Sequence, residues 1–144
     1  MHPSIALTLD AVIFAHKEKE LQVLLIQRKN DPFKGYWALP GGFLEENETL
    51  ESGCRRELQE ETGLRLDAEL FRTGIYDALN RDPRGRTITV AYSTLLDRPQ
   101  KVAGNDDASI ARWLMVNKLD GLAFDHELII RDALQRLKLL KYMD

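Results

Sequence analysis

The sequence contains a single cysteine, no excess of basic residues and no long apolar run. Cys54 alone cannot form an intrachain disulfide, which fits a reducing compartment. Lys and Arg number 20 against 23 Asp and Glu, and the formal net charge of −3 does not favour non-specific binding to nucleic acids or membrane surfaces. No apolar run approaches the roughly 18 residues that a membrane helix needs. We therefore expect no nucleic-acid partner and no membrane partner.

Targeting signals, repeats and linkers are also missing. The opening residues, MHPSIALTLDAVIFAH, lack a basic start and include Asp10, so they predict a first strand and not a secretory signal. The final KYMD shows no lipidation pattern. Apolar residues make up 44% of the 144 residues, which suffices for one hydrophobic core. We expect one domain, spanning residues 1–144, in the cytoplasm.

Hydrophobic patterning predicts strands separated by two helices. Strands are expected at residues 4–15, 21–28, 36–39, 67–78, 87–96 and 110–116, and helices at 49–62 and 125–141. Thr49 is a suitable N-cap for the first helix and Gly63 a suitable stop, while Asp125 is a suitable cap for the second. A second apolar helix face comprises Ile129, Ala133, Leu137 and Leu140. The order β-β-β-α-β-β-β-α indicates an α+β fold whose mixed sheet has antiparallel parts.

The first predicted helix places acidic side chains on its inner side. At about 100° per residue, Glu57 and Glu61 fall within the apolar stripe and Glu60 flanks it. That stripe comprises Leu50, Gly53, Cys54 and Leu58. Carboxylates so placed repel one another and lose hydration, and a divalent cation would remove the conflict. Alternatively, the helix end extends past the sheet, and the acids reach water and pair with Arg56.

The stretch GFLEENETLESGCRRELQEETGL then matches a known signature. Its fixed positions are Gly42, Glu48, Arg56, Glu57, Leu58, Glu60, Glu61, Gly63 and Leu64, without a gap. Average residue usage gives a chance match on the order of 10⁻¹⁰ per window. On these residues the sequence resembles the Nudix hydrolase family. The resemblance includes the preceding LLIQRKNDPFKGYWALPGG and implies an α/β/α sandwich around a mixed sheet, in which the signature forms a loop-helix-loop.

The resemblance also implies a chemistry and a set of ligands. Nudix hydrolases cleave a nucleoside diphosphate linked to another group into a nucleoside monophosphate and a phosphorylated product. By position, Glu57, Glu60 and Glu61 would bind Mg²⁺ or Mn²⁺, with the Gly42 carbonyl and Glu48 as further ligands. Arg56 would orient a glutamate of the cluster.

The general base has several candidates. It is either Glu57, by its position in the signature, or an acidic residue of a later loop, for which Asp106 and Asp107 are available. Cys54 is not expected to act as a nucleophile, because it lies on the apolar face without a histidine nearby in sequence.

Substrate-binding candidates come from other segments. Arg81, Arg84 and Arg86 lie in the hairpin loop NRDPRGRT, where guanidinium groups suit phosphate binding and the alternative is a solvated turn. Arg28 ends a predicted strand close to the PGG turn. The segment LAFDHELI adds Asp125 and His126, and with DPRGRT it resembles a bacterial branch that includes ADP-ribose pyrophosphatases and sugar-sensing regulators. A proline found in some ADP-ribose enzymes would fall at Asn80, and Pro83 is the nearest one here.

Three functions therefore remain open. The first is Mg²⁺- or Mn²⁺-dependent hydrolysis of ADP-ribose or a related nucleotide sugar. The second is removal of pyrophosphate from damaged nucleoside triphosphates, and the third is non-catalytic nucleotide or sugar sensing. Each has a small-molecule nucleotide partner, and the resemblance is compatible with a homodimer.

Overall fold

The computed structural model describes residues 1–103 and 110–144, and these residues form one mixed sheet with a helix on each side. The described strands are β1 (Ala6–Lys17), β2 (Glu20–Gln27), β3 (Trp37–Ala38), β4 (Gly41–Phe43), β5 (Phe71–Tyr76), β6 (Thr87–Leu96) and β7 (Ala111–Met115). The helices are α1 (Leu50–Thr62), α2 (His126–Arg136) and the short 3-10 helices η1 (Val116–Lys118) and η2 (Leu140–Met143). The sheet order is β3-β2-β1-β6-β5, with β4 paired to β1 and β7 to β2.

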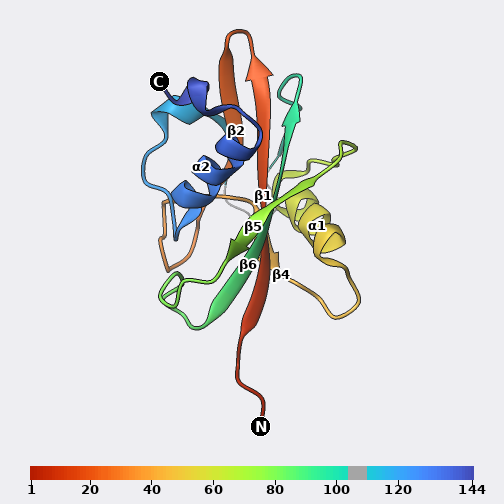
Figure 1. Ribbon diagram of the computed structural model, residues 1–144, viewed down its shortest axis with the longest axis vertical. Coiled ribbons are helices and arrows are strands. Elements are labelled where there is room, and N and C mark those ends of the chain that lie inside the picture. The colour runs from red at the N-terminus through yellow and green to blue at the C-terminus, as the bar shows by residue number, and fades with distance from the viewer. Residues whose placement is uncertain (104–109) are drawn as a thin grey trace.

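The central strand β1 separates two hydrophobic cores. It pairs in parallel with β6 and antiparallel with β2 and β4. Because side chains alternate along a strand, Leu9, Ala11 and Ile13 pack toward α1, whereas Val12 and Phe14 pack toward α2. In Figure 1 the two helices lie on opposite sides of the sheet. This is the predicted sandwich with a mixed sheet.

Helix α1 begins and ends where the sequence predicts. The Thr49 side chain accepts a hydrogen bond from the Ser52 backbone N–H, and the Ser52 hydroxyl accepts one from the Thr49 N–H. Gly63 adopts φ 75°, a left-handed conformation that ends the helix without a Cβ penalty. Cys54 and Leu58 are buried as predicted, and burial raises the pKa of the Cys54 thiol to about 12, which agrees with an unreactive thiol.

Several predicted boundaries were wrong. No strand was predicted directly after residues 36–39, yet Gly41–Phe43 forms β4 against β1. The last helix ends at Arg136 instead of residue 141, since Lys138 has φ 60°, which an α-helix cannot accommodate. Leu140 therefore lies in η2 and is 40% exposed. Asp125 precedes α2 but its side chain makes no capping hydrogen bond.

Within the described residues, no helix is both long enough and apolar enough to cross a bilayer.

Candidate active site

The PGG turn brings backbone groups against the acidic end of α1. The Gly41 N–H donates to Oε1 of Glu61 at 2.6 Å. A Cβ on Gly42 would lie 2.5 Å from the Glu57 carboxylate, and one on Gly41 would lie 2.1 Å from the Leu9 carbonyl oxygen. Gly41 leaves no room for a Cβ beside the backbone of β1, whereas a Cβ on Gly42 would displace the Glu57 carboxylate.

Arg56 holds the remaining acids of the signature. Its guanidinium donates to Glu48 at 2.7 and 2.8 Å, to Glu57 at 2.7 Å, to Glu60 at 3.2 Å and to the Phe43 carbonyl at 3.0 Å. These hydrogen bonds lower the pKa of Glu48 to about 2. The sequence left open whether the acids pair with Arg56. In the structure Glu48, Glu60 and one oxygen of Glu57 do so.

Glu61 differs from the other acids of the signature because it is only partly exposed and has no cationic partner within 4 Å in the described part of the chain. Burial raises its pKa to about 8, with the neighbouring Glu57 charge adding to the effect. Burial also raises the pKa of Glu57, although Arg56 opposes this. Across the described residues, no three His, Cys, Asp or Glu side chains are arranged to hold one metal ion. Glu57, Glu61 and Gly42 come together, while Glu48 and Glu60 face Arg56.

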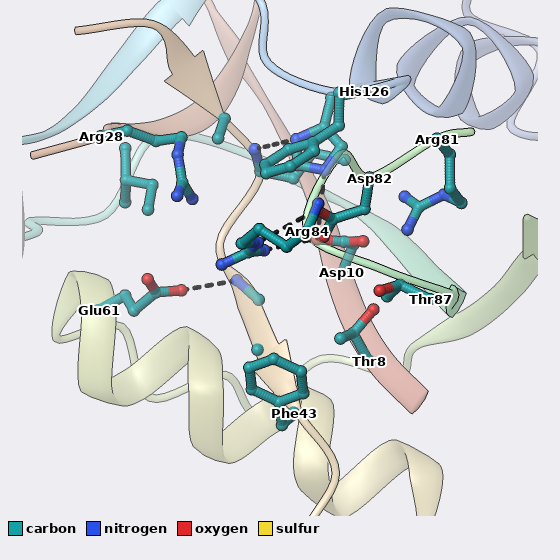
Figure 2. A pocket seen from close by; sticks show the side chains of 16 residues that line it. Thr8, Asp10, Arg28, Phe43, Glu61, Arg81, Asp82, Arg84, Thr87 and His126 are labelled. Atoms are coloured by element: carbon teal, nitrogen blue, oxygen red, sulfur yellow. Dashed lines mark hydrogen bonds and ion pairs between the residues drawn. The ribbon is translucent and has the colours of Figure 1, made fainter. Parts of the chain in front are cut away.

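A pocket of about 150 Å³ opens beside Glu61 and the turn (Figure 2). Its lining comprises Thr8, Asp10, Ile26, Arg28, Ala38, Leu39, Gly41, Gly42, Phe43, Glu61, Arg81, Asp82, Arg84, Thr87, Phe124 and His126. Four of the predicted substrate-binding residues are in this set, whereas Arg86 and Asp125 are not. The pocket therefore joins the end of the signature helix to the predicted substrate-binding segments.

Two guanidinium groups share one aromatic ring in the pocket. Arg28 and Arg84 lie 5.0 and 5.6 Å from the Phe124 ring centroid. Arg84 also donates to both carboxylate oxygens of Asp82, at 3.1 and 2.9 Å. Arg28 donates to the Pro32 carbonyl at 2.7 Å and forms no ion pair within the described residues. Burial and the Arg84 charge lower the pKa of Arg28, and the charges of Asp82 and Glu61 oppose this.

The other two arginines of the loop between β5 and β6 already bind protein groups. Arg81 forms a two-bond ion pair with Asp125, at 2.7 and 2.9 Å, and its side chain is 4% exposed. Arg86 donates to the backbone carbonyls of Asp77 and Ala78 at the surface. The ion pair fixes the β5–β6 loop to the start of α2.

We expect Arg81→Gln to reduce the free energy of unfolding by about 3 kcal/mol, because it leaves Asp125 without its partner in a largely buried position. Urea denaturation measures the change. Arg86→Gln is the matched control and should cost about 1 kcal/mol or less, since its bonds are exposed. Unchanged stability with a raised KM in Arg81→Gln would instead indicate direct substrate contact.

His126 is buried between the turn and the sheet. Its Nδ1 accepts a hydrogen bond from the Leu39 N–H at 3.0 Å, and its Nε2 lies 3.6 Å from Oδ1 of Asp10. The other Asp10 oxygen accepts from the Thr89 hydroxyl at 2.6 Å. These contacts connect α2 and β1 to the turn that faces Glu61.

His126 should make stability depend on pH. Burial lowers the pKa of its imidazole from 6.5, with Asp10 opposing. Below pH 6.5 the unfolded chain therefore takes up a proton that the folded chain resists, so the folded state loses stability. His126→Asn keeps an acceptor for the Leu39 N–H but does not titrate. We expect the difference in free energy of unfolding, wild type minus variant, to fall by about 1 kcal/mol per pH unit below pH 6.5. Urea denaturation at three pH values would reveal a constant difference if this is wrong.

Asp10, Asp82 and Phe124 line the pocket but were not among the residues predicted from the sequence. Asp10 could have been selected from the sequence, because it is an acid within a largely apolar strand. Asp82 lies between the selected arginines, and Phe124, with φ 51°, had no signal in the sequence. The base candidates Asp106 and Asp107 lie outside the described residues.

Comparisons with known proteins agree with this geometry. A family model described as NUDIX domain matches residues 6–137. The chain is 44% identical over 135 residues to an ADP-ribose pyrophosphatase of Methanocaldococcus jannaschii, covering 94% of this chain and 75% of that protein. It is 39% identical over 142 residues to the ADPR responsive transcriptional repressor NtrR of Acinetobacter baylyi, covering 94% of this chain and 56% of the repressor.

A solved structure gives a similar result. The NUDIX domain of Shewanella oneidensis NrtR, complexed with ADP ribose, matches with a TM-score of 0.86 and 36% identity, covering 94% of this chain and 90% of that chain. The predicted family, α+β fold and enzyme class are confirmed. The chain belongs to the Nudix hydrolase family and is a Nudix pyrophosphohydrolase.

Proposed function

We propose that this chain hydrolyses the pyrophosphate bond of ADP-ribose or a closely related nucleotide sugar. With ADP-ribose, water adds to one phosphorus and the bridging oxygen leaves with the other, giving AMP and ribose 5-phosphate. The observation that supports this most is the pocket that places Arg28 and Arg84 opposite Glu61 and the Gly41–Gly42 turn. The archaeal pyrophosphatase and the ADP-ribose complex of the Shewanella domain support the same substrate.

The acidic end of α1 fits a divalent cation. Glu57 and Glu61 are desolvated carboxylates beside the Gly42 backbone, and desolvation raises the pKa of both. Their negative charge is therefore unfavourable until a cation or a proton neutralises it. Hard oxygen ligands of this kind suit Mg²⁺ or Mn²⁺. Glu57, Glu61 and the Gly42 carbonyl would hold the ion, with Glu60 and Glu48 as further candidates. Such an ion would neutralise phosphate oxygens and lower the pKa of the attacking water.

Side chains of the protein would bind the phosphates, orient Glu57 and accept a proton. Arg28 lines the pocket, forms no ion pair among the described residues and would bind a phosphate oxygen. Arg84 lies on the same ring and would add a second positive charge. Arg56 fixes the orientation of Glu57 through a 2.7 Å hydrogen bond. Glu57 would take a proton from the attacking water, and the acids at positions 106 and 107 are the alternative bases.

Product analysis tests the substrate assignment. The protein is incubated with Mg²⁺ and, separately, with ADP-ribose, ADP-glucose and 8-oxo-dGTP. We expect AMP and a sugar phosphate from the first two, with kcat/KM for ADP-ribose at least about 100-fold above that for the triphosphate. Preferential release of pyrophosphate from the triphosphate would favour the sanitising function instead.

Ligand sensing is a second candidate function, favoured by the similarity to the Acinetobacter repressor. Calorimetry with ADP-ribose would favour it if binding were tight and AMP did not accumulate with Mg²⁺ or Mn²⁺ present. The expected single domain, cytoplasmic location, lack of a nucleic-acid partner and homodimer remain predictions.

A further inference from the structure

One wall of the pocket presents a hydrogen-bond donor and an acceptor next to each other. His126 and Asp10 come from α2 and β1 and face the pocket together (Figure 2). The Nδ1 atom of His126 accepts from the Leu39 N–H. A neutral imidazole carries one N–H, so this bond places the proton on Nε2.

Both groups have unused hydrogen-bonding capacity. Nε2 of His126 lies 3.6 Å from Oδ1 of Asp10, beyond the range of a good hydrogen bond. Oδ2 of Asp10 is held by the Thr89 hydroxyl, which fixes the carboxylate orientation. In the part of the chain that the structure describes, neither Nε2 nor Oδ1 has a hydrogen-bond partner, and the two residues are 4% and 6% exposed. The two residues line the pocket, so these two atoms are accessible there to a ligand or to solvent.

An N–H donor beside a carboxylate acceptor matches few chemical groups. A phosphate oxygen would be repelled by Asp10, and an alkyl group would leave both atoms unpaired. A hydroxyl group can accept from Nε2 and donate to Oδ1 at the same time. Two further hydroxyl side chains, Thr8 and Thr87, line the same region. We propose that the His126–Asp10 pair binds a sugar hydroxyl of the substrate, next to the phosphate site at Arg28 and Arg84.

This proposal adds a binding role within the proposed active site. It rests on the proposed function only for the assumption that the complete substrate is a nucleotide sugar. The hydroxyl could belong to the phosphorylated sugar or to the nucleoside ribose. We assign it to the phosphorylated sugar, because the pair and the two arginines proposed to bind phosphate line one small pocket. Binding of small fragments tests the pair without turnover.

Calorimetry with the wild-type protein compares ribose 5-phosphate with pentyl phosphate, which has five carbons and no hydroxyl. We expect ribose 5-phosphate to bind at least about tenfold more tightly. The 2-deoxy and 3-deoxy sugar phosphates then identify the hydroxyl. Equal affinity of ribose 5-phosphate and pentyl phosphate would overturn the proposal. AMP and 2′,3′-dideoxy-AMP form a second arm, and a hydroxyl preference confined to that arm would assign the pair to the nucleoside ribose and overturn the assignment to the sugar.

Asp10→Asn tests the pair from the protein side. The Thr89 hydroxyl would keep the amide oxygen, so the amide N–H₂ would face the pocket beside Nε2–H, and a ligand hydroxyl could no longer donate. The preference for ribose 5-phosphate over pentyl phosphate should fall to about threefold or less. Asp132→Asn is the matched control, because Asp132 bonds the Tyr76 hydroxyl away from the pocket, and it should keep the wild-type preference. An unchanged preference in Asp10→Asn would count against the pair.

The experiments distinguish failure of the hydroxyl-site proposal from failure of the proposed reaction. If ribose 5-phosphate binds with the expected hydroxyl preference but ADP-ribose is not hydrolysed, the hydroxyl site is supported and the proposed reaction is wrong. If ADP-ribose is hydrolysed while sugar and alkyl phosphates bind equally, the reaction is supported and the hydroxyl site is wrong.

Discussion

Replacing Glu61 by glutamine should lower kcat for ADP-ribose on the order of 10³-fold while the protein remains folded. Glu61 is the glutamate of the signature that lines the pocket, and its carboxylate is the charge that the proposed cation site would lose. Glutamine has the same shape, can accept the Gly41 N–H bond and resembles the protonated carboxyl that burial favours. We therefore expect the free energy of unfolding at neutral pH to be maintained or slightly raised.

Steady-state kinetics and urea denaturation measure the two effects, and Mn²⁺ titration by calorimetry should show weaker binding in the variant. Glu51→Gln is the matched control, since Glu51 lies on the same helix, pairs with Arg55 and is half-exposed. That variant should keep kcat within about twofold. Product release by Glu61→Gln at the wild-type rate would show that Glu61 has no role in the reaction.

Replacing Arg56 by glutamine should lower kcat about 10- to 100-fold. Its guanidinium orients one oxygen of Glu57 and neutralises Glu48, and glutamine cannot make the same set of bonds. The freed carboxylates would repel one another, so the thermal midpoint should also fall. The loss should appear in kcat more than in KM, because Arg56 does not line the pocket.

Arg55→Gln separates this effect from general damage to the helix. Arg55 is the adjacent arginine, and it donates to the Leu66 and Ala68 carbonyls on the other flank of α1. We expect a lower thermal midpoint but nearly unchanged kcat. Similar losses of kcat in both variants would mean that Arg56 acts through helix stability alone.

The signature helix could be predicted in detail because its determinants are local. Capping by Thr49, termination at Gly63 and the inward position of Glu57 and Glu61 follow from residue spacing along one helix. Family resemblance then supplied the topology of the sheet. The strand β4 was missed because two glycines give no strand signal, and its pairing with β1 forms through tertiary contact.

The pocket was less predictable because it depends on contacts between distant segments. Arg81 and Asp125 were each selected as substrate-binding residues, yet they bind each other across 44 positions. Asp10 meets His126 only after α2 packs on the sheet. No local pattern specifies such pairs.

Incubation of the wild-type protein with ADP-ribose and Mg²⁺, with quantification of AMP and ribose 5-phosphate, is the most direct test. We expect equimolar formation of the two products, loss of both on addition of a chelator, and recovery with excess Mg²⁺. Intact ADP-ribose in the presence of Mg²⁺ or Mn²⁺, under conditions in which the protein is folded and binds the nucleotide, would contradict the proposed reaction.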